Sequence, residues 1–576
     1  MEVPSTKKIL DSIPFEIVGK IFLEALPQNP RPDPTQPPLL LTQICRQWRS
    51  IADTSPELWS QIEIKVTFQG HMLTTPSSFA KYKSQIKNRQ ALIARWLTKA
   101  SSARVSLSLY ILDHSLRGVF PSVRLRVNRE VINPFLNHIF AEQFTRNWYD
   151  VNIVSVEEPY QSRLFMIPSN HLPSLKRLSF NGHCARSSMR SESDKQPLSS
   201  LFESGMIQAP VLEALSISGI ETQIQLSTLP LANWSGLTEL RVDRRLTRAT
   251  NYIPNEDYHA AFIRCADTLC MLAFSGGDSP GPYDAPTPTS TDPTANTTKP
   301  YPPLTFPHLP TLTVTECISY ARETSELHPL VSSLLTPALQ SLHWHTRDQP
   351  TQTSSSALLS FARTNTSPSQ PTLLKLTTLS LCYSHLTHPE LLELLEMLSA
   401  PAPSALKTLK LHSSDRITFN WRSGIYATRC ALLLSSFLDR LTPKTDPPVH
   451  EPSESSGHTS PSPSTALASH LILLPSLEEF SCELGHEEEF TDLDLLYFIQ
   501  SRRPTAQTHT TSSSAPSHLV QPTKPYLKKV SVKFVSKQTI DIAAALAEPD
   551  HTQISTSDLT LEVSYGNKCR WEPDYP

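Results

Sequence analysis

The sequence predicts a mixed α/β protein in which a short N-terminal helical module precedes a long array of parallel strands alternating with helices. Two observations lead to this fold class. Apolar residues between Leu10 and Ile62 recur with the 3.6-residue period of helices. After residue 170, a Leu-x-x-Leu-x-apolar pattern returns ten times with helical stretches between its copies. Such alternation at a period of roughly 25 to 40 residues indicates a solenoid of stacked repeats. We therefore expect three parts, 10–62, 63–170 and 171–576.

The composition excludes several function classes. The chain of 576 residues holds 51 prolines and only 14 glycines, so glycine-dependent phosphate loops are not expected. Its net charge of −3 provides no electrostatic footprint for nucleic acid or for an anionic membrane. Nine scattered cysteines without a Cys-x-x-Cys pair indicate free thiols in a reducing compartment. Without a signal-peptide core or an 18-residue apolar run, we expect a soluble protein of the cytoplasm, the nucleus or both.

The N-terminal module reads as three short helical segments. In the first, Ile17, Val18, Ile21 and Phe22 form an apolar stripe, and Pro14 suits the first turn. Prolines between 27 and 38 end this helix. A second helix is predicted over 41–52, and a third segment contains Leu58, Trp59 and Ile62. About fifty residues of helix cannot bury all these side chains among themselves, so an apolar face is left for a partner.

These segments resemble an F-box, in particular the F-box common in proteins of mushroom-forming fungi. The matching elements are Ile13-Pro14-Phe15-Glu16-Ile17, Ile21-Phe22, Ile44-Cys45-Arg46-Gln47-Trp48-Arg49 and Pro56-Glu57-Leu58-Trp59. The resemblance implies a non-catalytic substrate receptor of a cullin–RING (SCF-type) ubiquitin ligase, which docks a Skp-type adaptor and through it a cullin. The implied adaptor-binding residues are Ile13, Pro14, Ile17, Ile21, Phe22, Leu41, Ile44, Cys45, Trp48, Leu58 and Trp59. Some of them must form the module's own core, and the sequence does not divide the two groups.

The ten copies of the repeated pattern are predicted strands. In each copy, the two leucines and the apolar residue two positions after the second leucine point inward, while the intervening residue points outward. The first leucines of the copies are Leu175, Leu212, Leu237, Leu269, Leu309, Leu339, Leu376, Leu406, Leu477 and Leu527 (phenylalanine or valine replaces the second leucine in the last two copies). The pattern resembles an irregular leucine-rich repeat that lacks the usual turn asparagine. A doubly wound α/β sheet is the alternative.

Helices are expected between these strands, at 198–207, 257–269, 327–335, 389–398, 426–441 and 492–502. Residues 63–170 read as degenerate capping repeats, with a helix over 89–100 and strands over 105–111 and 151–156. The alternating residues 559–565 predict the last strand. Four inserts rich in Pro, Ser and Thr, at about 275–305, 345–371, 442–468 and 504–525, are expected to be disordered.

No catalytic constellation, cofactor motif or metal site is recognised. His343 and His345 share one strand face, but a third ligand at a suitable spacing is missing. Outward charged positions of the strands are the candidates for contact with an unidentified protein target: Arg177, Glu239, Arg241, Lys407, Lys410 and Glu479. A protein-interaction scaffold with an F-box-like helical cap and no ligase role remains the alternative to the receptor hypothesis.

Overall fold

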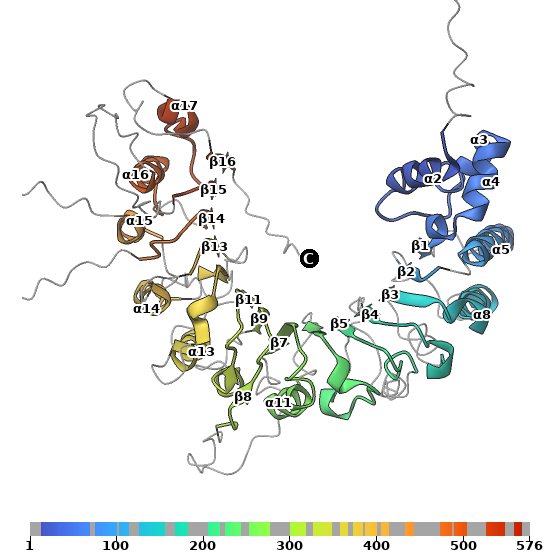
Figure 1. The fold of residues 1–576 in the computed structure, drawn as a ribbon, viewed down its shortest axis with the longest axis horizontal. Coiled ribbons are helices and arrows are strands. Elements are labelled where there is room, and N and C mark those ends of the chain that lie inside the picture. The colour runs from blue at the N-terminus through green and yellow to red at the C-terminus, as the bar shows by residue number, and fades with distance from the viewer. Residues whose placement is uncertain are drawn as a thin grey trace, which may run out of the picture. The chain divides into compact units, whose positions relative to one another are not determined.

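The computed structural model describes residues 13–68, 75–100, 103–113, 126–155, 167–182, 205–218, 225–243, 253–276, 300–317, 327–347, 357–366, 372–383, 386–399, 405–413, 433–442, 473–485, 489–503, 526–547 and 558–566. The chain forms two compact units, Met1–Ser275 and Gly276–Pro576. Figure 1 shows the elements of both units, coloured along the chain.

The first unit begins with helical segments and continues as a parallel sheet. The segments are α2 (Phe15–Glu24), α3 (Leu41–Ile44), α4 (Arg46–Thr54) and the 3₁₀ helix η1 (Pro56–Trp59). Each following strand pairs in parallel with the next one along the chain. These strands are β1 (Gln61–Phe68), β2 (Val105–Asp113), β3 (Trp148–Ser155), β4 (Arg177–Gly182), β5 (Ala214–Ser218), β6 (Glu239–Asp243) and β7 (Met271–Gly276).

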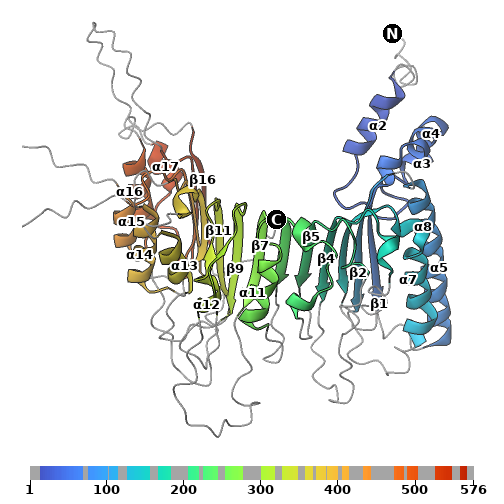
Figure 2. The same cartoon turned by 60° about the horizontal axis from the view of Figure 1, so that its bottom comes forward.

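Helices cover one face of this sheet. They are α5 (Pro76–Lys99), the π-helical segment η3 (Asn128–Ile132), α7 (Asn133–Ile139), α8 (Glu142–Thr145), α11 (Asn255–Ile263) and the short 3₁₀ turns η4 (Ser169–His171), η6 (Leu226–Thr228) and η7 (Trp234–Gly236). Figure 2 shows α5 and α7 side by side at the end of the sheet that begins with β1. The core lies between the two layers, where Trp96, Leu109 and Ile153 are fully buried.

The second unit repeats this architecture. Its sheet contains β9 (Thr311–Cys317), β11 (Ser341–Arg347), β12 (Thr378–Cys382), β13 (Thr408–His412), β14 (Glu479–Glu483), β15 (Lys529–Phe534) and β16 (Thr560–Tyr565), all parallel and in chain order. Two short strands, β8 (Leu304–Thr305) and β10 (Leu334–Leu335), pair separately. The helical segments are α12 (His328–Val331), α13 (Ala357–Thr366), η8 (Thr372–Lys375), α14 (His388–Ser399), α15 (Ser435–Leu441), α16 (Asp492–Arg502) and α17 (Ile542–Ala547). In Figure 1, α13 to α16 line one face of this sheet.

The repeated leucine pattern explains the strands. In the copy around β9, Leu309, Leu312 and Val314 are all buried, while Thr313 between them is partly exposed. Because neighbouring strands pair in register, Leu312 lies beside Leu342 of β11, and the apolar residues form continuous layers. All ten predicted strands and their parallel pairing are thereby confirmed. Neither unit reverses its strand order, as a doubly wound sheet would, so that alternative is wrong within each unit.

Two predicted helices agree closely with the structure, and others are shorter. The 492–502 helix is confirmed as α16, and the 389–398 helix as α14. The 257–269 helix is displaced toward the N-terminus as α11, because Pro254 sets its start. Of 426–441, the described part forms α15. The 89–100 helix is the C-terminal half of the longer α5, and the 105–111 and 151–156 strands are β2 and β3.

Three predicted helices need correction. The 327–335 stretch is a single helical turn, α12, followed by strand β10. In the 198–207 stretch, the described residues 205–207 form a turn with Met206 and Ile207 buried. The predicted 41–52 helix is interrupted at Cys45, whose backbone is extended (φ −153°, ψ 170°). Its Sγ accepts a hydrogen bond from the Trp48 N–H at 3.4 Å and so caps α4.

The prediction that the 345–371 insert is disordered is wrong for Ala357–Thr366, which form α13. Leu358, Phe361 and Ala362 of this helix are buried at helical spacing. Asn365 is buried as well, and its amide donates to the Leu334 carbonyl at 2.8 Å and accepts from the Thr336 N–H at 3.1 Å. The flanking Ser and Thr residues obscure this short apolar stripe in the sequence. Residues 277–299, 443–468 and 504–525 of the other inserts lie outside the described residues. The prediction of disorder is wrong for the end of the 275–305 insert, where Leu304–Thr305 form β8.

Candidate functional site: an apolar surface on the N-terminal helices

Helix α2 has one buried apolar stripe and exposed apolar residues beside it. Val18 and Phe22, one turn apart, are buried, and the Phe22 ring lies 4.8 Å from that of Trp48 on α4. Ile17 and Ile21, also one turn apart, remain 45% and 52% exposed. Helix α2 therefore docks on the rest of the unit through one stripe and presents a second stripe to the outside.

Further large apolar side chains are exposed nearby in the sequence. Phe15 of α2 is 65% exposed, and Ile44, at the end of α3, is 52% exposed. Leu23 and Leu40 are exposed to 40% and 38%. Isolated exposed apolar residues are common on protein surfaces, but several of them on a ten-residue helix are typical of an interaction site.

The structure divides the predicted adaptor-binding residues into two groups. Accessible residues are Pro14, Ile17, Ile21, Ile44 and Cys45, with Ile13 and Trp48 half-buried. Phe22, Leu41, Leu58 and Trp59 are buried within the chain. The prediction that these last four residues contact an adaptor is therefore corrected, since a buried side chain has no surface left for a partner.

Trp59 shows why this group belongs to the core. Its indole Nε1 donates to the Ala52 carbonyl at 2.7 Å, and its ring packs edge-on against Trp96 of α5 at 5.1 Å. Trp96 in turn donates to the Trp59 carbonyl at 2.9 Å, and the Lys99 ammonium lies over the Trp59 ring. The third predicted segment thus anchors the N-terminal helices to the sheet domain.

Several outward strand residues of the first unit form ion pairs. Arg241 of β6 pairs with Glu239 of the same strand at 2.7 Å. Arg177 at the start of β4 lies 3.4 Å from Asp150, its partner in the register of β3. Burial raises the pKa of Asp150, and the positive charge of Arg177 opposes that rise. These three predicted target-facing residues (Arg177, Glu239 and Arg241) lie on the face that the helices do not cover.

In the second unit, the charges form a ladder across strands. Lys407 directly precedes β13, Lys410 lies within β13, and Glu479 begins β14. Glu478 accepts ion pairs from Lys407 at 3.1 Å and from Lys528 at 2.7 Å. The hydrogen bonds from these two ammonium groups lower the pKa of Glu478. Sequence reasoning missed Glu478 and Lys528, because only the strand register brings them to Lys407.

Among the described residues, no group of three or more metal-ligating side chains is assembled, and no helix has the length and apolar character to cross a bilayer. No protein-family model matches the chain, and no curated protein matches it.

Proposed function

We propose that this chain is a non-catalytic substrate-recognition subunit of an SCF-type cullin–RING ubiquitin ligase. In this proposal, the helices between Pro14 and Trp59 act as an F-box that binds a Skp-type adaptor and thereby a cullin. The strand array is an irregular leucine-rich-repeat-like domain that binds the protein target. The ligase's ubiquitin-carrying partner then acts on the target by proximity.

One observation carries the proposal: the exposed pair Ile17 and Ile21 lies within the Pro-x-Glu-Ile and Ile-Phe elements that resemble the F-box. An exposed apolar helix stripe is stabilised when a partner's groove covers it. Packing of Phe22 on Trp48 and of Trp59 on Trp96 holds the backbone below this stripe in place. The surface is therefore organised before a partner arrives, which reduces the entropy lost on binding.

The strand array supports the second half of the proposal. In each unit, register pairing aligns one face as buried apolar layers, and the opposite face carries the polar rows. In the first unit, Ser216 stands between Ser179 and Arg241 on this face, and in the second unit Lys410 stands beside Ser481. Rows of short polar side chains with a few charges suit a target whose larger side chains fill the space between the two surfaces and whose charges complement those of the strands.

Copurification tests the proposal. Tagged full-length chain, coexpressed with a Skp-type adaptor and cullin, is expected to retain both. Ile17→Asp together with Ile21→Asp is expected to abolish retention, because two carboxylates would enter an apolar interface. Lys20→Asp, which places the same carboxylate on an exposed position of α2, is the matched control and should retain the complex.

The outcome separates the receptor from the scaffold. Retention of adaptor and cullin, lost only in the double variant, supports the receptor. If the wild-type chain retains neither protein while its fold is intact by circular dichroism, the receptor proposal is overturned in favour of a scaffold outside the ligase.

A further inference from the structure

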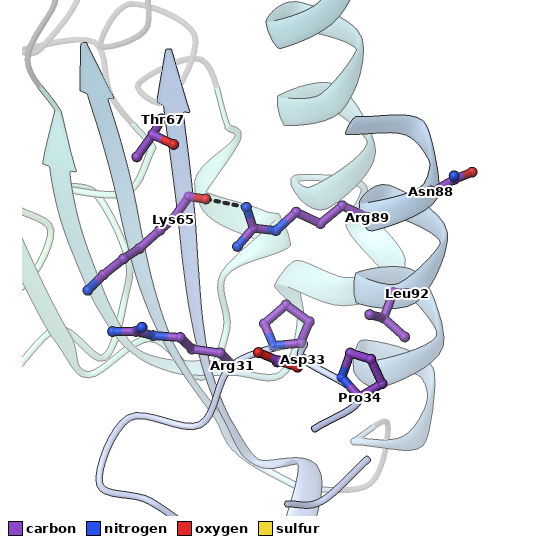
Figure 3. A pocket seen from close by; sticks show the side chains of 9 residues that line it. Arg31, Asp33, Pro34, Lys65, Thr67, Asn88, Arg89 and Leu92 are labelled. Atoms are coloured by element: carbon purple, nitrogen blue, oxygen red, sulfur yellow. Dashed lines mark hydrogen bonds between the residues drawn. The ribbon is translucent and has the colours of Figure 1, made fainter. Parts of the chain in front are cut away.

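A cavity of about 490 Å³ lies at the edge of the first unit's sheet. Its walls come from three separate parts of the chain: the proline-rich insert after α2, the edge strand β1, and the middle of α5. Figure 3 shows Arg89 extending from α5 toward β1, with Arg31 and Lys65 at the opposite side of the cavity. The lining includes Arg31, Asp33, Lys65, Thr67, Arg89 and Leu92.

Two of the cations at this cavity share a single carboxylate. The Arg31 guanidinium Nε donates to Glu63 Oε1 at 2.6 Å, and the Lys65 ammonium lies 3.0 Å from the same oxygen. The Glu63 side chain is buried, whereas the side chains of Arg31 and Lys65 are 44% and 35% exposed. One negative charge thus holds two positive charges together, which leaves an excess of one positive charge.

Arg89 adds a third positive charge. Its Nη1 donates to the Lys65 carbonyl at 2.5 Å, which is its one hydrogen-bond acceptor among the described residues. A guanidinium has five N–H donors, so most of its capacity is directed elsewhere. Burial lowers the pKa of Arg89, and the positive charge of Arg31 acts in the same direction, while Tyr82 and Asp33 oppose the shift.

Asp33, the acidic residue in the lining, is already engaged. Its Oδ1 accepts hydrogen bonds from the Thr35 N–H at 2.8 Å and from the Thr35 hydroxyl at 2.7 Å. Counting Glu63 and Asp33 against Arg31, Lys65 and Arg89, the cavity keeps a net charge of +1. The insert, the strand and the helix converge there without supplying a further anion among the residues described at the cavity.

We propose that this cavity binds the phosphate group of a small phosphorylated molecule. Two guanidinium groups and one ammonium offer the forked and point-charge donors that phosphate oxygens accept. The volume exceeds that of one phosphate and lies in the range of small-molecule sites. Leu92, Pro32 and Pro34 provide apolar contact for the remainder of the ligand. This inference does not depend on the ligase proposal.

Calorimetry and thermal unfolding of the full-length chain at constant ionic strength test the site. Ribose 5-phosphate is the probe, with inorganic phosphate and a phosphoserine peptide as comparison arms. Ribose 5-phosphate at about ten times its Kd is expected to raise Tm by about 2 °C or more. Inorganic phosphate should bind more weakly, because it lacks the part that contacts Leu92 and the prolines.

Variants connect this binding to the cavity. Arg31→Gln and Arg89→Gln are each expected to weaken ribose 5-phosphate binding about tenfold, since each removes a charge-assisted hydrogen bond. Lys87→Gln, an exposed position on α5 outside the lining, loses the same charge and should bind as the wild type does. Arg31→Gln keeps the strand-edge contact of Arg89, so it reports on binding even if Arg89→Gln disturbs folding.

Four results would overturn the proposal. The first is that neither ribose 5-phosphate nor inorganic phosphate binds. The second is that Arg31→Gln binds ribose 5-phosphate as tightly as Lys87→Gln does. If only the phosphoserine peptide binds, the site serves a protein partner instead. Inorganic phosphate that binds as tightly as ribose 5-phosphate would overturn the assignment of an organic ligand.

Discussion

The neighbouring residues Ile21 and Phe22 allow the separation of core and docking surface on α2 to be tested directly. Phe22 is 1% exposed and packs on Trp48, whereas Ile21 is 52% exposed. Truncation of a buried phenylalanine to alanine costs about 3–5 kcal/mol of stability. Phe22→Ala should therefore release α2 from the unit, while Ile21→Ala should leave the fold unchanged.

The effect of Ile21→Ala on binding follows from its exposed fraction. Complete burial of an isoleucine side chain contributes about 1.5–3 kcal/mol, and about half of the Ile21 surface is left for a partner to cover. The loss on truncation is therefore about 1 kcal/mol, or about fivefold in the Kd for a Skp-type adaptor.

Hydrogen exchange and calorimetry provide the two readouts. Phe22→Ala is expected to reduce the protection of α2 amides by more than about 100-fold, and Ile21→Ala to leave protection unchanged while it weakens adaptor binding. The reasoning is refuted if Ile21→Ala reduces protection as strongly as Phe22→Ala, because the two stripes would then not differ in role.

Three further predictions concern the second unit and the thiols. The buried guanidinium of Arg502 donates to carbonyls including that of Leu441, and its burial lowers its pKa to about 10. Arg502→Met should therefore cost about 3 kcal/mol of stability and expose α15 and α16 to hydrogen exchange. Unchanged protection of these helices would contradict this role. The ion pairs of Glu478 lower its pKa, so its stabilising contribution is present at neutral pH and is lost as the pH falls through that lowered value. Glu478→Gln should accordingly lower Tm at pH 7 and reduce the fall of Tm on acidification, as differential scanning calorimetry from about pH 7 to pH 3 would detect; an unchanged pH profile would count against it. Cys45 is exposed, whereas Cys265 is buried and this burial raises the pKa of its thiol to about 12. Iodoacetamide at about pH 8 should therefore label Cys45 and spare Cys265. Mass spectrometry, with a urea-unfolded control, measures the labelling, and equal labelling of the two thiols in the folded chain would show that the prediction is wrong.

The strands were predictable because burial on one face leaves a period-two signature in the residues themselves. The copy at Leu309 has it, and the structure buries each inward position. The break at Cys45 was not predictable, because Leu41, Ile44 and Trp48 have helical spacing whether or not one peptide unit between them is extended. Helix α13 was missed for a related reason: Asn365 is polar in the sequence, yet it is buried by hydrogen bonds to the distant Leu334 and Thr336.

The sequence by itself determined the alternation of strands and helices, the parallel pairing, and the apolar character of the N-terminal helices, since each follows from local periodicity. Only the tertiary structure decided which apolar side chains remain accessible: Ile17 and Val18 are equivalent in the pattern, but packing against α4 buries one stripe and leaves the other. The cation-lined cavity likewise exists only after folding, because Arg31, Lys65 and Arg89 come from three distant segments. Local patterns record which residues can be buried, and long-range packing selects those that are.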